Sequence, residues 1–194
     1  MSTLSGTKIK DTYSGLLKTT DNAALSGTFK AVTDGAGNNS GLELNTTYAR
    51  ATNGILFGSD TAAANALDDY EEGSWAPTIS SGTHTYTTRT GEYVKIGKLV
   101  ILKGTLYLSS RGASGGELGI GGLPFASAGT PSSSFNFTSQ YGAASLLGST
   151  VLPTGASAEN TICYLRRAES TAVTYTVDSL AASGGVVFTI IYTA

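Results

Sequence analysis

The clearest pattern of apolar and polar positions lies in the C-terminal part of the chain, between Leu99 and Ser109. Even-numbered residues there form a nearly continuous apolar set, whereas odd-numbered residues mix Lys, Thr and Tyr with Leu and Ile. Alternation with a period of two predicts a β-strand whose two faces differ. A second strand is predicted at residues 93–96, and the intervening Gly97-Lys98 predicts a two-residue turn that joins the two strands as a β-hairpin.

The end of the chain predicts another kind of strand. Residues 186–192 are apolar on both faces, which is typical of a strand that is central in a sheet or packed on both sides. Short strands separated by Gly- and Ser-containing turns predict an antiparallel β-sandwich, of the jelly-roll type, over residues 78–194. Four further strands of this sandwich are predicted at residues 134–140, 143–152, 160–166 and 173–177.

The N-terminal part, residues 1–60, is predicted to be short-stranded and poor in large apolar residues. Turns rich in Gly, Asn and Asp separate its strand candidates. Short strands with one apolar side cannot close a core alone. We therefore expect this part to bury its apolar side against identical chains, and a homotrimer is one closed symmetry that does so. The candidates are residues 12–18, 27–33, 41–44, 47–49 and 54–57.

Between these parts, residues 61–77 are predicted to form a short helix followed by an acidic junction. Residues 61–67 are Ala-rich, and Ala has the highest helix propensity, so about two helical turns are expected, with Asp60 or Thr61 as the cap. The segment from Asp68 to Pro77 then contains four of the fourteen acidic residues and the only tryptophan. We interpret its carboxylates as solvated charges of a structured junction.

Composition and charge narrow the classes of partner. Charged residues make up 13% of the chain and the formal net charge is −2, with no cluster of Lys and Arg that could neutralise phosphates. Nucleic acid and anionic membranes are therefore poor partners, and no apolar run approaches the ~20 residues of a membrane span. The N-terminal sequence lacks the apolar region of a secretory signal, so assembly in a cytoplasm is expected. The single cysteine, Cys163, is expected to be a buried core residue.

Candidates for catalytic chemistry are few. The single histidine, His84, is expected to be an exposed strand residue, and no nearby His or Cys suggests a metal site. A Ser-His-Asp triad would be non-local, but no Gly-x-Ser-x-Gly elbow supports one. Paired carboxylates could hydrolyse glycosides, as in a phage depolymerase, but such pairs usually come from separated strands. Here the candidates are consecutive or nearly so, namely Asp68, Asp69, Glu71 and Glu72.

Other motifs favour structural roles. Residues 34–39 carry the Asp and Asn oxygens that Ca²⁺ prefers, but they lack the spacing and distal Glu of an EF-hand, so a plain turn is expected. The glycines of residues 115–122 open no helix and form no dinucleotide fingerprint. Tyrosines suit both carbohydrate contacts and subunit interfaces, although packing is the default for Tyr107, Tyr141 and Tyr164. We therefore predict no catalytic, cofactor-binding or metal-binding residues, and no enzyme activity.

Three sequence blocks follow one another in order between residues 68 and 125. The first block is D-D-Y-E-E-G-S-W-A-P at residues 68–77, the second is Y-V-K-I-G-K-L-V at residues 93–100, and the third is G-G-L-P-F at residues 121–125. As an ordered set they resemble a recurring module of tailed-bacteriophage virion proteins, found in tail-fibre and other fibre-like proteins of marine and cyanobacterial phages. Residues 13–60 also resemble the Gly- and Asn-punctuated shaft that precedes such modules.

The resemblance implies a non-enzymatic structural protein located in the virion, a short homotrimeric phage tail fibre. Its N-terminal region would contact other virion structural proteins and form a three-chain shaft. Its C-terminal β domain would point outward and contact a host-surface glycan receptor or a neighbouring structural protein. A capsid decoration or cement protein, or a head fibre, is the alternative, and a depolymerase is disfavoured because separated carboxylates are missing. No cofactor is expected.

Overall fold

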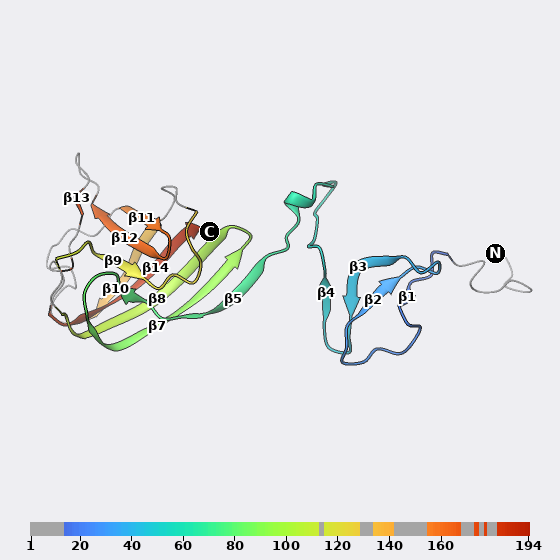
Figure 1. The fold of residues 1–194 in the computed structure, drawn as a ribbon, viewed down its shortest axis with the longest axis horizontal. Helices are drawn as coiled ribbons and strands as arrows, with labels where there is room; N and C mark the ends of the chain where they lie inside the picture. The colour runs from blue at the N-terminus through green and yellow to red at the C-terminus, as the bar shows by residue number, and fades with distance from the viewer. Residues whose placement is uncertain are drawn as a thin grey trace, which may run out of the picture. The chain divides into compact units, whose positions relative to one another are not determined.

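The computed structural model describes residues 14–112, 115–128, 134–141, 155–167, 173–174, 177 and 182–194. The chain divides into two compact units, Met1–Asp68 and Asp69–Ala194. Within the described residues the regular structure is β apart from the 3₁₀ turn η1 (Ala63–Asn65) and a 3₁₀ conformation at Val177, and the sheets are antiparallel (Figure 1). The prediction of an all-β protein is confirmed. The described residues contain no helix with the length and apolar character that crossing a membrane requires.

The first unit contains one four-stranded antiparallel sheet with the strand order β1-β2-β3-β4. Its described residues bury almost nothing: in residues 14–68 the only buried residue is Thr33. Large apolar side chains are instead exposed, with Leu17 at 68% and Phe57 at 66%. This unit therefore lacks an apolar core of its own within the residues described. Its strands are β1 (Lys18–Thr19), β2 (Lys30–Thr33), β3 (Asn39–Leu44) and β4 (Ala49–Ala51).

The helix predicted over residues 61–67 is wrong, because the structure has only the three-residue turn η1 there. The Asp60 side chain accepts hydrogen bonds from the backbone N–H of Ala62 (2.9 Å) and from Nδ2 of Asn65 (2.7 Å), which closes a tight turn. Leu67 then pairs with Ile55 through two backbone hydrogen bonds. High Ala propensity is overruled because η1 buries no side chain that would stabilise a longer helix.

The second unit contains a long five-stranded sheet with the order β10-β14-β8-β7-β5. The predicted hairpin is confirmed, because Ile96 pairs with Leu99 and Gly97 adopts φ +56° in the turn. The final strand is central, as expected, since β14 lies between β10 and β8. The strands are β5 (Tyr70–Trp75), β7 (Thr85–Ile96), β8 (Leu99–Ser110), β10 (Ser134–Tyr141) and β14 (Gly184–Thr193).

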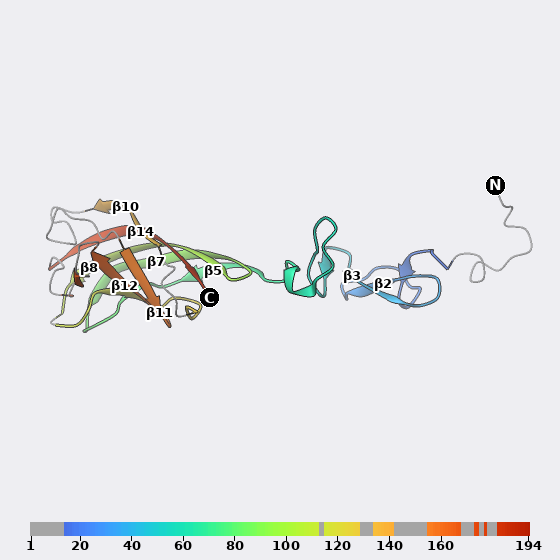
Figure 2. The ribbon, with the colours of Figure 1, turned by 90° about the horizontal axis from the view of Figure 1, so that it is seen from above.

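The second sheet of this unit has the order β11-β12-β9-β6, with β13 paired to β12. Its strands cross those of the long sheet obliquely and cover one of its faces (Figures 1 and 2). These strands are β6 (Thr78–Ile79), β9 (Gly119–Gly121), β11 (Gly155–Glu159), β12 (Ile162–Arg167) and β13 (Val173–Thr174). The strand predicted at residues 143–152 lies outside the described residues.

Side chains from both sheets meet in one core, which makes the second unit sandwich-like. The even-numbered face of β8 is buried as predicted, with Val100, Leu102 and Leu106 fully inaccessible. The predicted core position of Cys163 is also confirmed. The remaining core residues are Trp75, Ile79, Leu108, Leu118, Ile120, Leu123, Leu165, Val177, Val186, Phe188, Ile190 and Tyr192.

A pair of opposing glycines lets two aromatic rings lie against the inner face of the long sheet. Gly91 pairs directly with Gly104, and the ring of Trp75 covers the first while that of Phe188 covers the second. The two rings meet edge to face, with centroids 6.2 Å apart. Nε1 of Trp75 donates a hydrogen bond to the carbonyl oxygen of Lys103 at 3.0 Å, so the indole is fixed in position.

Candidate functional site

The acidic segment forms an edge strand of the second unit rather than a separate junction. The long sheet ends at β5, and alternation along β5 places Glu71 on the same face as buried Trp75. The hydroxyl of Tyr93 donates to Oε1 of Glu71 at 2.5 Å, and Nζ of Lys95 donates to the carboxylate of Asp69. Two of the four carboxylates thus bind side chains of β7. Charges along a free edge also oppose pairing with another strand.

Lys95 connects this edge to the core. Its side chain is only 12% exposed, and Nζ lies 5.4 Å from the centroid of the Phe125 ring. Phe125 also meets Tyr93 edge to face at 5.3 Å, and its carbonyl oxygen accepts a hydrogen bond from the hydroxyl of Tyr192 at 2.9 Å. Burial raises the pKa of Tyr192 to about 12. The carboxylate of Asp69, at 46% exposure, is the partly solvated end of this structural cluster.

His84 is not the exposed strand residue that the sequence predicted. It precedes β7 and is half-buried, with its Nδ1 accepting a hydrogen bond from the backbone N–H of Gly112 at 3.3 Å. Its Nε2 lies 2.6 Å from the carbonyl oxygen of Ser81, and only the tautomer protonated at Nε2 satisfies both contacts. The ring therefore ties two loops together, which is a structural role.

The predicted turn at residues 34–39 is confirmed in its hydrogen bonding. The Asp34 carboxylate accepts from the backbone N–H and the side-chain Nδ2 of Asn38, both at 2.8 Å. These bonds hold the pKa of Asp34 below its usual value. Both carboxylate oxygens thus have donors within the turn. Across the described residues, no group of three or more His, Cys, Asp or Glu side chains is placed to hold a metal ion.

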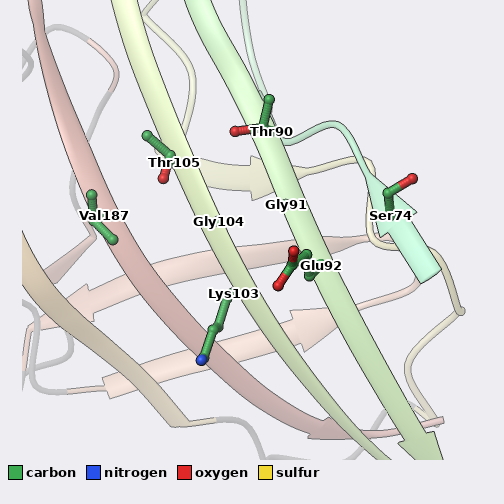
Figure 3. A pocket seen from close by; sticks show the side chains of 8 residues that line it. All are labelled: Ser74, Thr90, Gly91, Glu92, Lys103, Gly104, Thr105 and Val187. Carbon is green, nitrogen blue, oxygen red and sulfur yellow. The ribbon is translucent and has the colours of Figure 1, made fainter. Parts of the chain in front are cut away.

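The outer face of the long sheet carries a groove that the sequence patterns did not identify. It crosses β5, β7, β8 and β14 and has a volume of about 490 Å³ (Figure 3). Its side chains come from the face opposite the core, which is why a search for apolar periodicity passed over them. The lining side chains are Ser74, Thr90, Glu92, Lys103, Thr105 and Val187, over the backbone of Gly91 and Gly104.

The groove has polar side chains for which the described residues provide few hydrogen-bond or ion-pair partners. Glu92 and Lys103 are exposed and directly opposite each other in register, yet they form no ion pair within the described residues. Hydroxyl groups on Ser74, Thr90 and Thr105 add donors and acceptors. A second hollow of about 410 Å³ continues along β5 and β7, past Ser74 and Glu92.

This arrangement suits binding of an extended polar molecule rather than a small buried ligand. Sites for small molecules are usually deep and mostly apolar. Here the floor is sheet backbone, and β7, β8 and β14 are each paired with strands on both sides, so recognition depends on side chains. A carboxylate, an ammonium and hydroxyls can bind the hydroxyls of a saccharide chain that lies across the strands.

Neither Tyr107 nor Tyr164, two of the tyrosines named from the sequence, lines this groove. Tyr107 lies on the outer face of β8 with its ring against the backbone of Gly185. Tyr164 is half-buried on β12, and the side chain of Tyr141 lies outside the description. Comparisons with protein-family models, with curated proteins and with solved structures found no match to this chain. The functional argument therefore depends on the architecture.

Proposed function

We propose that this chain is a structural component of a bacteriophage virion, a short homotrimeric tail fibre whose second unit contacts a host-surface glycan. The single observation that carries the proposal is the contrast between its two units. The described residues of the second unit include a core of sixteen buried apolar residues, whereas residues 14–68 bury only Thr33. A unit that leaves its apolar surface exposed to water is best explained by partners that cover that surface.

The exposed apolar surface of the first unit is extensive. Nine large apolar side chains between residues 14 and 68 are exposed. Soluble monomers rarely expose large contiguous apolar patches, and such patches usually mark interfaces. Burial of this surface against identical chains would contribute roughly 25 cal/mol for each Å² removed from water. The nine are Leu16, Leu17, Leu25, Leu42, Tyr48, Ile55, Leu56, Phe57 and Leu67.

Three copies are proposed because a three-fold ring closes and because the sequence blocks resemble fibre proteins of that kind. The first unit then forms a shaft, through which the fibre also contacts other virion proteins. The second unit supplies its own stability from its core and can present the groove of Glu92 and Lys103 to a receptor. A saccharide lying over this open surface is the receptor class that its hydroxyls and charges support.

Sedimentation equilibrium of the whole chain tests the proposal. The expected mass is three times the 19.8 kDa monomer mass, and Leu17→Ser combined with Phe57→Ser should shift the equilibrium toward monomer. Thr61→Ser is the matched control, since Thr61 is exposed but polar, and it should leave the mass unchanged. A monodisperse monomer over a wide concentration range would refute the proposed assembly.

A capsid decoration or head-fibre protein is the second candidate. The same observation favours it, because an uncovered first unit can also bury its apolar side chains against a shell protein. Labelling of virions that carry this chain, followed by electron microscopy, separates the two functions. Label on the tail supports the fibre, and label on the capsid supports the decoration protein.

A further inference from the structure

We propose that an apolar strip on the outer face of the long sheet is a second interface between copies of this chain. The inference rests on the proposed homo-oligomer and extends it to a named surface of the second unit. The strip comprises Tyr70 of β5, Val94 and Ile96 of β7, Leu99 and Ile101 of β8, and Ile191 of β14.

The strand register makes the strip contiguous. Tyr70 pairs with Ile96, which pairs with Leu99 on the next strand. One step further along the strands, Val94 pairs with Ile101, which pairs with Ile191. Two adjacent rows of apolar side chains therefore cross the sheet.

These side chains lie on the face that the sandwich core does not cover. Their sequence neighbours Val100, Ile190 and Tyr192 point the other way and are at most 1% exposed. Strip residues are much more accessible: Tyr70 is 60% exposed and Ile96 is 43% exposed. Leu99 and Ile191 follow at 42% and 37%. An apolar cluster of this kind on an outer face is characteristic of a protein–protein contact.

Chain connectivity favours a second copy as the occupant. Tyr70 lies two residues after Asp68, where the first unit ends. Copies that assemble through their first units would therefore hold their strips within reach of each other at a high effective concentration. A modest apolar contact can then form without strong affinity of its own.

Charges beside the strip suit a contact between copies. Glu72 borders it on β5, whereas Lys98 borders it in the turn before β8, and both are exposed. Neighbouring copies can set the carboxylate of one against the ammonium group of the other, which favours specific docking. An added peptide strand is disfavoured here, because β7, β8 and β14 have hydrogen-bonded neighbours on both sides.

Thiol labelling of the whole chain tests the inference. Cys163 is fully buried, so a maleimide reports on an introduced cysteine in the folded protein. Ile96→Cys places the thiol in the strip, and Thr88→Cys is the matched control on the same strand and face, outside the strip. Leu99→Cys provides a second probe if Ile96→Cys perturbs folding. Oligomeric state is measured in parallel by sedimentation.

In the oligomer, the Ile96→Cys thiol should react about tenfold more slowly than the Thr88→Cys thiol, because it opens to solvent only when copies separate. After dilution to monomers, the Ile96→Cys thiol should react faster than the Thr88→Cys thiol, since Ile96 is 43% exposed and Thr88 is half-buried. An oligomer in which the Ile96→Cys thiol reacts faster would overturn the strip interface and leave the proposed fibre standing. A chain that stays monomeric overturns both. Slow labelling of the Ile96→Cys thiol in a monomer would overturn the strip as a contact between copies.

Discussion

Replacement of Gly91 by Ala tests how the core of the second unit is built. A Cβ at this position would lie 2.6 Å from the carbonyl oxygen of Lys103 and would overlap the indole of Trp75. Overpacking of this kind costs about 1–3 kcal/mol, and a broken Trp75–Lys103 hydrogen bond adds roughly 0.5–1.5 kcal/mol. Ala is better than Gly in a strand by about 0.5–1 kcal/mol, which offsets part of the loss. The expected net loss in the free energy of unfolding is about 2 kcal/mol.

Urea unfolding at fixed protein concentration measures this loss. Trp75 is the only tryptophan of the chain and lies in the core, so its fluorescence follows the second unit alone. With a denaturant slope of about 2 kcal/mol per M, the midpoint for Gly91→Ala should fall by about 1 M urea. Gly115→Ala is the control, because a Cβ there meets no atom of the described residues within 4 Å, and it should change the midpoint little. Equal midpoints for the two variants would refute the packing argument.

Two further predictions concern the buried hydroxyl and the groove. Because the folded pKa of Tyr192 is raised to about 12, the folded state keeps its proton longer than the unfolded state, so stability should fall as pH rises from about 10 to 12. Tyr192→Phe should flatten the stability curve between about pH 10 and 12. It should also lower the free energy of unfolding at neutral pH by about 1–3 kcal/mol, because the carbonyl of Phe125 loses its hydrogen-bond donor. An unchanged slope in urea unfolding at alkaline pH would contradict this prediction. On an array of bacterial surface polysaccharides, Glu92→Gln with Lys103→Met should abolish binding that Lys98→Met retains, and equal binding by both variants would exclude the groove.

The alternation of residues was sufficient to predict the main strands. The hairpin at Gly97, the buried even-numbered face of β8 and the central place of β14 all follow from local patterns. The burial of Cys163 followed from residue type and its apolar neighbours. Strands and turns of this kind depend on residues close in sequence, so a single sequence contains the necessary information.

Other features depended on partners far away in the chain. The Ala-rich segment before Asp68 forms only a 3₁₀ turn, because propensity without a buried face does not sustain a helix. The interpretation of His84 as an exposed residue failed because Gly112, which binds its ring, lies 28 positions away. The groove was missed because its polar residues come from three strands, β5, β7 and β8, and only their register brings them together.

The sequence by itself determined that the protein is all-β, and its scarcity of large apolar residues indicated a first unit without a core. Only the tertiary structure decided what the acidic segment does. Asp69 binds Lys95 and Glu71 binds Tyr93, across strands that are more than twenty residues apart in sequence. Side-chain periodicity records which face of a strand is apolar, but not which strand lies beside it. The pairing is set by long-range packing of the whole sandwich, and it turns a run of carboxylates into the anchored edge of a sheet.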